Sequence, residues 1–275
     1  EPLERILADL AWLHDRLQAR PAGRPSRVRM ASGPLVPWRC SDDALRETTA
    51  LARSWGAPTH IHVAETQAEV QMTLSDTGHR PVHWLDSLGL LGPDTQVVHG
   101  VWLDEGDMDL LAARGATVVH CPVSNAVLGS GVAPVRALRQ RGVAVRLGSD
   151  GPASNDTQDM FETVKAALSL ARASALDPEA LSAQAALAMA LSTRGLTMGA
   201  PADVILVDLN TPRAMPVHDL DSALALCTHG SDVDTAIVGG RILLRGKRLL
   251  VLDEGALLAE CRDAVRGLWQ RAGLG

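Results

Sequence analysis

The stretch TQVVHGVWLDEGDMDLLAARGATVVHC, residues 95–121, contains one strand–helix–strand unit. Its two ends, 95–100 and 116–121, are short runs rich in β-branched residues, which are typical of strands. The amphipathic segment between them, 104–115, predicts a helix that ends at Gly115, because glycine suits the C-cap position. A helix that joins two strands in this way predicts a parallel pair.

The same alternation extends to both sides of this unit. Further strand candidates are RVRMASG (27–33), THIHVAE (59–65) and VAVRLGSD (143–150), and a helical pattern covers 41–55. Five strands in series therefore alternate with helices, which indicates βα units on a parallel sheet.

Polar side chains gather at or just after the carboxyl ends of these strands. They are His62, Glu65, His99, His120, Asp150 and Asn155. The carboxyl ends of the strands form the active-site face of a (β/α)8 barrel. We therefore predict an α/β fold of the (β/α)8 TIM-barrel type rather than a doubly wound sheet. A full barrel has eight strands, so the five found here correspond to about strands 4 to 8, and the first strands are expected to be missing from this chain.

The pattern changes after an alanine-rich helical stretch at 156–194. Residues 203–209 and 235–250 resemble antiparallel strands joined by glycine-containing turns, and a final helix follows. We predict a barrel at 1–197, a small β domain from a composite β-sandwich at 198–252, and a C-terminal helix at 253–275.

Composition restricts the classes of partner. The formal charge is −6 and the basic residues are scattered, so we expect no nucleic-acid or membrane-surface partner and favour a small-molecule substrate. No apolar run is long enough for a membrane span. The four cysteines are far apart without a CxxC pair, which favours reduced thiols and a cytoplasmic location.

Two strand-end residues have the chemistry of metal ligands. His62 offers an imidazole nitrogen and Asp150 a carboxylate, both of which bind zinc. Glu65 and His99 at neighbouring strand ends could move protons. Each has a simpler explanation: an isolated histidine is more often a hydrogen-bonded surface or core residue, and an isolated glutamate more often caps a helix or lies in solvent. The loops at 120–125 and 148–156 could position a ligand, but their residues are also those of ordinary turns.

The ordered combination is more specific than its parts. HIHVAET (60–66), followed by the continuous stretch from VVHG (97–100) to NDTQDMFE (155–162), resembles the amidohydrolase superfamily. The resemblance is strongest to the branch of methylthioadenosine/S-adenosylhomocysteine deaminases, triazine hydrolases and guanine-type deaminases. It covers nearly the whole chain, including GPLVPWRCSDDAL (33–45) upstream.

The resemblance implies a set of site residues. His62 and Asp150 match metal ligands, while Glu65, His99 and Asp150 match the catalytic groups that move protons. The residues that match the substrate pocket are Trp38, His120, Ser124, Asn125 and Asn155. His60 falls outside the ligand match, and we expect it to point to the opposite side of the strand from His62.

The resemblance also implies the chemistry. One divalent ion, zinc or in some relatives iron, would activate water for attack on a cyclic amidine in a nucleoside, purine, pterin or triazine, and ammonia would leave. A methylthioadenosine or S-adenosylhomocysteine-type substrate is favoured, and a homodimer is expected from the family. One alternative is a hydrolase of the same fold that removes chloride or an alkylamine. Another is a non-catalytic fragment or paralogue that cannot hold metal.

Three departures from the family pattern bear on these expectations. No H-x-H pair precedes residue 59, so only two of the expected protein ligands are present. Leu35 occupies a position where many adenosine-type members have histidine, which weakens the adenosine interpretation. The segment at 195–198 is shorter than in relatives, which suggests a gap or a deletion.

Overall fold

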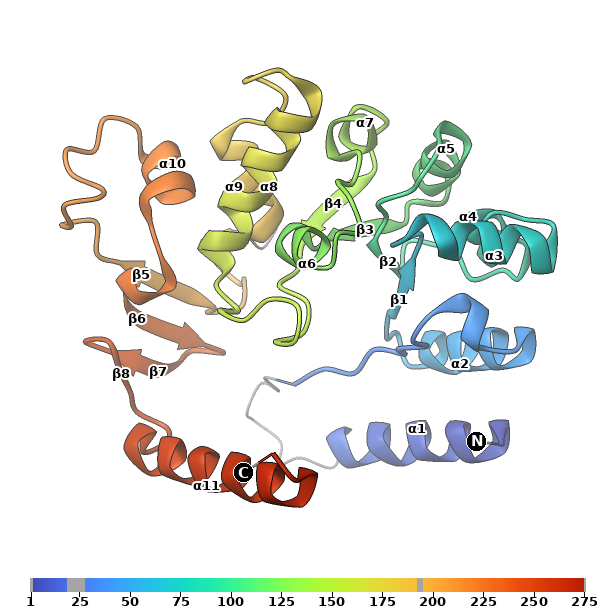
Figure 1. Ribbon diagram of the computed structural model, residues 1–275, viewed down its shortest axis with the longest axis horizontal. Coiled ribbons are helices and arrows are strands. Elements are labelled where there is room, and N and C mark those ends of the chain that lie inside the picture. Colours follow the sequence, from blue (N-terminus) through green and yellow to red (C-terminus); the bar gives the residue numbers. More distant parts are fainter. Residues whose placement is uncertain (1, 19–27, 192–194, 275) are drawn as a thin grey trace. The chain divides into compact units, whose positions relative to one another are not determined.

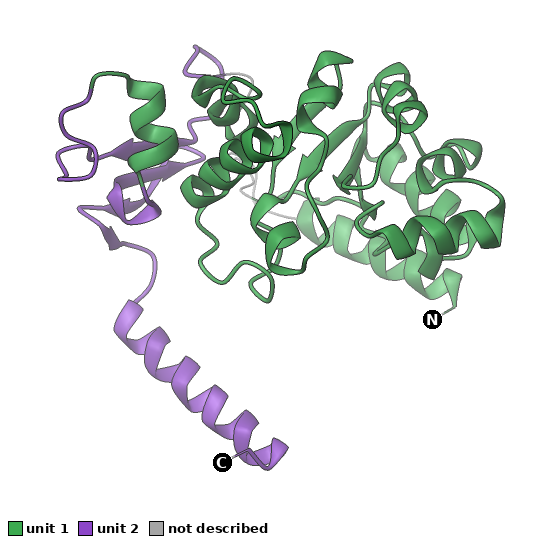
Figure 2. Ribbon diagram, turned by 45° about the horizontal axis from the view of Figure 1, so that its top comes forward, with its two compact units in different colours: residues 1–193, 218–228 green, residues 194–217, 229–275 purple. Residues whose placement is uncertain are grey.

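The computed structural model describes residues 2–18, 28–191 and 195–274. It divides into two compact units (Figure 2). The first contains residues 1–193 and 218–228, and the second contains residues 194–217 and 229–275. The two units are described separately below.

The first unit is built on a four-stranded parallel sheet (Figure 1). Its strands are β1 (Thr59–Val63), β2 (Thr95–His99), β3 (Thr117–His120) and β4 (Ala144–Leu147), and they pair in sequence order. Sequential parallel strands with intervening helices are the arrangement of a barrel, whereas a doubly wound sheet reverses its strand order at a switch point. The carboxyl ends of all four strands therefore lie on one face.

Alternate residues of the strands face the helices and form the core. Ile61, Val63, Val97 and Val118 have no exposed surface. Because successive strand residues point to opposite sides, the residues between them face the other side of the sheet, and in β1 they are only partly buried. This alternation leaves β1 with one apolar, helix-covered face and one face that carries polar side chains.

Helices follow every strand of the sheet. They are α3 (Gln67–Thr77) and α4 (Pro81–Ser87) after β1, α5 (Glu105–Arg114) after β2, α6 (Pro122–Val127) and α7 (Val135–Gln140) after β3, and α8 (Met160–Ala175) and α9 (Ala183–Ala190) after β4. Among the described residues before the sheet, the elements are α1 (Leu3–Gln18), the 3-10 turn η1 (Pro37–Arg39) and α2 (Asp42–Ser54).

The α5 helix shows why the central unit folds as predicted. The side chain of Asp104 accepts a hydrogen bond from the Asp107 backbone N–H, and the Asp107 side chain accepts one from the Asp104 backbone N–H. Two N–H groups that have no partner within the helix are thereby satisfied. At the other end Gly115 is left-handed, with φ of 69°. The helix predicted at 104–115 is confirmed.

The strand predicted at 27–33 is wrong in the described residues. Among residues 28–33 only Ser32 takes part in a β-bridge, an isolated parallel one to Thr59, and residue 27 lies outside the described part. Pro34 follows directly and has no N–H to donate to a continuing ladder, which is a physical reason for the short pairing.

Residues 218–228 pack within the first unit. They form α10 (Leu220–Ser222) and the π-helical turn η2 (Ala223–Cys227), which contact α8 and α9. They fall within the range 198–252 that the sequence assigns to the small β domain. The domain boundary predicted at 197 and the short segment at 195–198 fall among the described residues, whereas residues 192–194 just before them lie outside the described part.

The second unit is an antiparallel sheet followed by a long helix. Its elements are β5 (Val204–Val207), the 3-10 turn η3 (Gly230–Asp232), β6 (Val233–Val238), β7 (Arg241–Arg245), β8 (Arg248–Leu249) and α11 (Glu254–Ala272). The antiparallel strands and the final helix predicted from the sequence are therefore present. In the described part of the chain, no helix combines the length and the apolar character needed to cross a membrane.

Candidate active site

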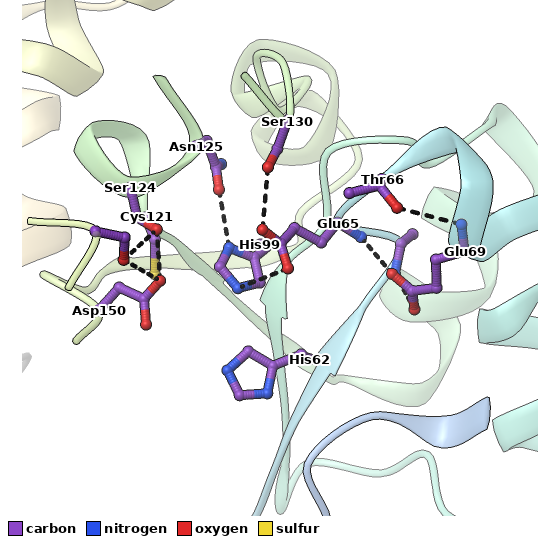
Figure 3. Close-up of polar contacts among 12 residues, drawn as sticks. His62, Glu65, Thr66, Glu69, His99, Cys121, Ser124, Asn125, Ser130 and Asp150 are labelled. Atoms are coloured by element: carbon purple, nitrogen blue, oxygen red, sulfur yellow. Dashed lines mark hydrogen bonds and ion pairs between the residues drawn. The ribbon is translucent and has the colours of Figure 1, made fainter. Parts of the chain in front are cut away.

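The candidate site lies at the carboxyl ends of the parallel strands, where three non-glycine residues have a left-handed backbone. Ala64 follows β1, His99 ends β2 and Asp150 follows β4, with φ of 52°, 68° and 60°. Such conformations cost free energy and persist where the surrounding structure holds them, often at functional sites. Figure 3 shows the side chains of this region.

His62 has the surroundings of a metal-binding histidine. Its Nδ1 donates to the backbone carbonyl of Leu35 at 2.6 Å, and its ring stacks on that of His99 with centroids 5.2 Å apart. A hydrogen bond from Nδ1 fixes the tautomer and leaves the Nε2 lone pair available, as in many metal-ligating histidines. Leu35, at the position where the resemblance leads us to expect histidine, thus contacts His62 through its backbone.

The expectation that His60 points away from His62 is wrong. The two rings make an edge contact with centroids 6.5 Å apart, because residues two apart on a strand share a face. His60 lies further from the strand end, and its Nδ1 bonds Gln96 Oε1 at 2.8 Å. The two imidazoles of β1 therefore occupy successive positions on one face, and that of His60 is engaged by Gln96.

Glu65 is held at its backbone by Glu69, which the sequence analysis missed. The two carboxylate oxygens of Glu69 accept from the backbone N–H groups of Ala64 and Glu65, at 3.0 and 2.8 Å. Burial raises the pKa of Glu69, although these hydrogen bonds oppose the shift. Thr66 caps α3 and accepts from the Glu69 backbone. Together these contacts fix the left-handed turn that presents the Glu65 side chain.

His99 connects Glu65 to a buried amide. Its Nδ1 donates to Asn125 Oδ1 at 2.8 Å, and its Nε2 lies 3.7 Å from Glu65 Oε2 (Figure 3). His99 and Asn125 are 1% and 0% exposed. The amide therefore orients the imidazole so that its second nitrogen faces the carboxylate.

Asp150 is held as an ionised carboxylate. Its Oδ2 accepts from Ser124 at 2.5 Å and from Ser154 at 3.2 Å, and its Oδ1 accepts from the Gly151 backbone at 2.7 Å. Burial by itself would raise the pKa of Asp150, but these hydrogen bonds and the nearby His99 outweigh it, so the pKa is lowered. Asp150 is therefore available at neutral pH as a proton acceptor or metal ligand.

His120 and Cys121 lie deeper, at the end of β3. Burial first, and the nearby His99 second, lower the pKa of His120 to about 4. Burial raises the pKa of the Cys121 thiol to about 12, and Asp150 and Glu65 add to the shift. Both side chains are therefore neutral at physiological pH, and Cys121 is not a thiolate nucleophile.

The predicted pocket residues divide into two kinds. Ser124, Asn125 and Asn155 are at most 1% exposed; the first two bond Asp150 and His99, and Asn155 donates to the Ser149 carbonyl at 2.9 Å. Trp38 is 37% exposed and lies under the Arg39 guanidinium, 4.6 Å from its ring centroid. A substrate-binding role for each remains a prediction.

Ser130 is a further residue that the sequence analysis missed. Its hydroxyl donates to Glu65 Oε1 at 3.0 Å. In the sequence, Ser130 lies between two glycines in LGSGV (128–132). This pattern indicates a tight loop but does not predict the hydrogen bond to Glu65.

The described residues contain no group of three or more histidine, cysteine, aspartate or glutamate side chains arranged to hold a metal. His62 and Asp150 remain the two candidate ligands. Their hydrogen-bond partners, a backbone carbonyl behind the imidazole and hydroxyl and N–H donors behind the carboxylate, are those that accompany ligands in metal sites. The donor set fits a zinc ion that takes its other ligands from elsewhere.

Comparison with known proteins identifies relatives of the whole arrangement. Residues 15–243 match the Amidohydrolase family. The 5'-deoxyadenosine deaminase of Methanosarcina mazei is 41% identical over 254 residues, which cover 89% of this chain and 59% of that protein. The 5-methylthioadenosine/S-adenosylhomocysteine deaminase of Pelotomaculum thermopropionicum is 39% identical over 259 residues, 90% of this chain and 60% of that protein.

The fold has a close counterpart among solved structures. The crystal structure of an adenosine deaminase from Xanthomonas campestris with bound zinc superposes with a TM-score of 0.86 at 33% identity. The match covers 94% of this chain and 61% of that one, and it confirms the predicted barrel-type α/β fold. This chain spans about 60% of the length of the curated relatives it matches. By sequence and by fold, the chain belongs to the amidohydrolase family.

Proposed function

We propose that this chain carries part of the active site of a metal-dependent deaminase that acts on the adenine ring of a 5'-modified nucleoside. One observation carries the proposal: His99 links Glu65 to Asn125 at the strand ends, beside a His62 ring whose Nε2 is free. The nucleoside class is supported by the relatives, which are named 5'-deoxyadenosine and methylthioadenosine/S-adenosylhomocysteine deaminases.

His62 and Asp150 would hold the divalent ion, together with ligands outside those described. Zinc is favoured, with iron as the alternative, because a solved relative contains zinc and the imidazole and carboxylate donors suit it. When bound, the ion would supply a water molecule whose pKa is low enough to provide a nucleophile near neutral pH.

The residues of this chain would manage the protons. Asp150, ionised through its hydrogen bonds, accepts a proton from the attacking water. Glu65 and Asp150 then pass protons to the departing amino group, including the proton that Asp150 takes from the water, and His99 Nε2 lies 3.7 Å from Glu65 Oε2. Overall, water replaces the amino group on the ring carbon and ammonia leaves, which balances the atoms of a hydrolytic deamination.

The test measures ammonia release and metal content of the full protein. We expect turnover of 5'-deoxyadenosine or methylthioadenosine and about one zinc or iron ion per chain. His62→Ala should lower both, and Asp150→Asn should slow turnover by at least ~1000-fold, since metal-assisted water activation supplies several kcal/mol. The exposed His79 provides the control, and His79→Ala should change neither.

Other outcomes would favour other functions. Release of chloride or an alkylamine from a triazine, without nucleoside turnover, would favour the alternative hydrolase. A full protein that binds no metal would contradict the proposal and favour a non-catalytic paralogue. A cytoplasmic homodimer also belongs to this proposal; it rests on the four unbridged cysteines and on the family resemblance, and sedimentation of the purified protein tests the dimer.

A further inference from the structure

Ser130 is a buried hydroxyl whose position is fixed by its backbone. The residue is 6% exposed; its N–H donates to the Asn125 carbonyl at 2.8 Å and its carbonyl accepts from Trp102 Nε1 at 2.8 Å. Gly131 follows with φ of 120°, and a Cβ there would come within 3.0 Å of Val101. The loop can therefore hold Ser130 in only a narrow range of positions.

The Ser130 hydroxyl is directed at one oxygen of Glu65. It donates to Oε1 at 3.0 Å, whereas the other oxygen, Oε2, lies 3.7 Å from His99 Nε2 (Figure 3). The backbone of Glu65 is already fixed by Glu69. The remaining freedom of the carboxylate is rotation of its side chain, and the hydrogen bond from Ser130 restricts that rotation.

The same segment orients the other candidate catalytic groups. Ser124 and Asn125, on α6, bond Asp150 and His99, and Ser130 follows in the loop after that helix. Seven consecutive positions, 124–130, thus supply a hydrogen-bond partner for each of three groups on three different strand ends. If these residues only bound substrate, they would not need to hydrogen-bond the candidate catalytic groups. If they position those groups, such hydrogen bonds are required.

We propose that Ser130 is a positioning residue that keeps Glu65 Oε2 as the oxygen that carries the transferred proton. Because Oε1 accepts a hydrogen bond from the Ser130 hydroxyl, a proton taken up by Glu65 is placed on Oε2, on the side of His99. The inference rests on the proposed function, since it assigns Ser130 to the proton transfer of that reaction.

The first experiment compares the steady-state kinetics of Ser130→Ala with those of the native full protein, using 5'-deoxyadenosine and methylthioadenosine. We expect kcat to fall about 10- to 100-fold while KM changes less than about 3-fold, because the carboxylate is misplaced and the substrate contacts remain. Ser130→Thr, which retains a hydroxyl, should recover most of kcat. Ser87→Ala is the matched control, since Ser87 donates only to the Trp84 carbonyl within its own helix region, and it should leave kcat unchanged.

A double-mutant cycle separates positioning of Glu65 from a general structural effect. In a Glu65→Gln background, Ser130→Ala should lower kcat by less than about 3-fold, because the group it positions is already disabled. An equal loss in both backgrounds, or a change in KM alone, would overturn the proposal. If Ser130→Ala does not fold, Ser130→Cys, which replaces the hydroxyl with a weak donor, is expected to give the same kinetic pattern.

A structural measurement distinguishes failure of this inference from failure of the proposed function. If the native protein deaminates no nucleoside, the proposed function fails, and the crystal structure of Ser130→Ala still tests the positioning. A Glu65 carboxylate turned away from His99 would support the positioning role. A carboxylate that keeps its native orientation would refute it.

Discussion

The buried, neutral imidazole of His120 makes stability depend on pH in a way that one substitution can isolate. His120 is 1% exposed, and its Nδ1 has no hydrogen-bond partner among the described residues. Burial, with a smaller effect of His99, lowers the pKa to about 4 from the ordinary value of 6.5. The unfolded chain therefore binds a proton at His120 between these pH values, whereas the folded protein does not.

The sign and size of the effect follow from this difference. A base whose folded pKa is lowered stabilises the folded state fully above its unfolded pKa, and that stability is lost as the pH falls toward the folded pKa. Between pH 7 and 4.5, the pKa values of 6.5 and about 4 correspond to a loss of about 2.5 kcal/mol in the free energy of unfolding.

The assay is equilibrium urea unfolding of the metal-free protein at pH 7 and pH 4.5, followed by tryptophan fluorescence. Five of the six tryptophans lie in the first unit, so the signal reports mainly on the unit that contains His120. His120→Leu removes the titration and keeps an apolar side chain at the site. The native protein should lose about 2.5 kcal/mol more than the variant over this pH range.

Equal pH dependence of the two proteins would refute the assignment of a buried, neutral His120. If the free energy of unfolding changes by the same amount in both, within about 0.5 kcal/mol, His120 is protonated in the folded state or is not buried. His79→Leu removes an exposed histidine and should retain the native pH dependence. This control would show that loss of a histidine elsewhere does not produce the effect expected of His120→Leu.

Two further predictions concern packing and buried charge. Asp107 is fully buried and bonds Arg80 at 2.7 Å, so Asp107→Ala should lower the free energy of unfolding by about 2 kcal/mol in urea titrations. The exposed Asp109→Ala on the same helix should cost less than about 1 kcal/mol, and equal losses would contradict the argument from burial. Gly148→Ala would place a Cβ 3.0 Å from Val119 Cγ1, so we expect a loss of about 1–2 kcal/mol in thermal or urea unfolding. An unchanged midpoint would show that the strand end can move to accept a methyl group.

The sequence predicted the parallel unit and its functional face because both depend on local pattern. The strands β1 to β4 coincide with β-branched runs, and α5 with an amphipathic segment bounded by its caps. The carboxyl ends of parallel strands meet on one face. The sequence alone therefore predicts that four side chains lie near one another there: His62, Glu65, His99 and Asp150. The strand predicted at 27–33 is wrong over its described residues, 28–33, because β-branched composition does not show that Pro34, which follows, stops the ladder after the one bridge at Ser32.

The partners of the site residues could not be predicted in the same way. The bond from Ser130 to Glu65 joins residues 65 positions apart, and the bond from Asn125 to His99 joins residues 26 apart. Nothing in the local sequence specifies such pairs, since a loop rich in Ser, Asn and Gly has the composition of any ordinary turn. Glu69 likewise looked like a residue of the first turn of α3, and only the folded chain shows it bonded to the strand end.

The stretch THIHVAET (59–66) separates what the sequence predicts from what only the tertiary structure shows. The sequence by itself determined that a strand ends there with an imidazole and a carboxylate three residues apart, because strand propensity and turn chemistry are local. The resemblance assigns the ligand position to His62, but the expectation that His60 points away is wrong: strand alternation puts both rings on one face, and only the tertiary structure shows how their surroundings differ. Gln96 engages His60, and the Leu35 carbonyl fixes His62 with Nε2 free, because hydrogen bonds across the fold, rather than neighbours in sequence, set the surroundings of each ring.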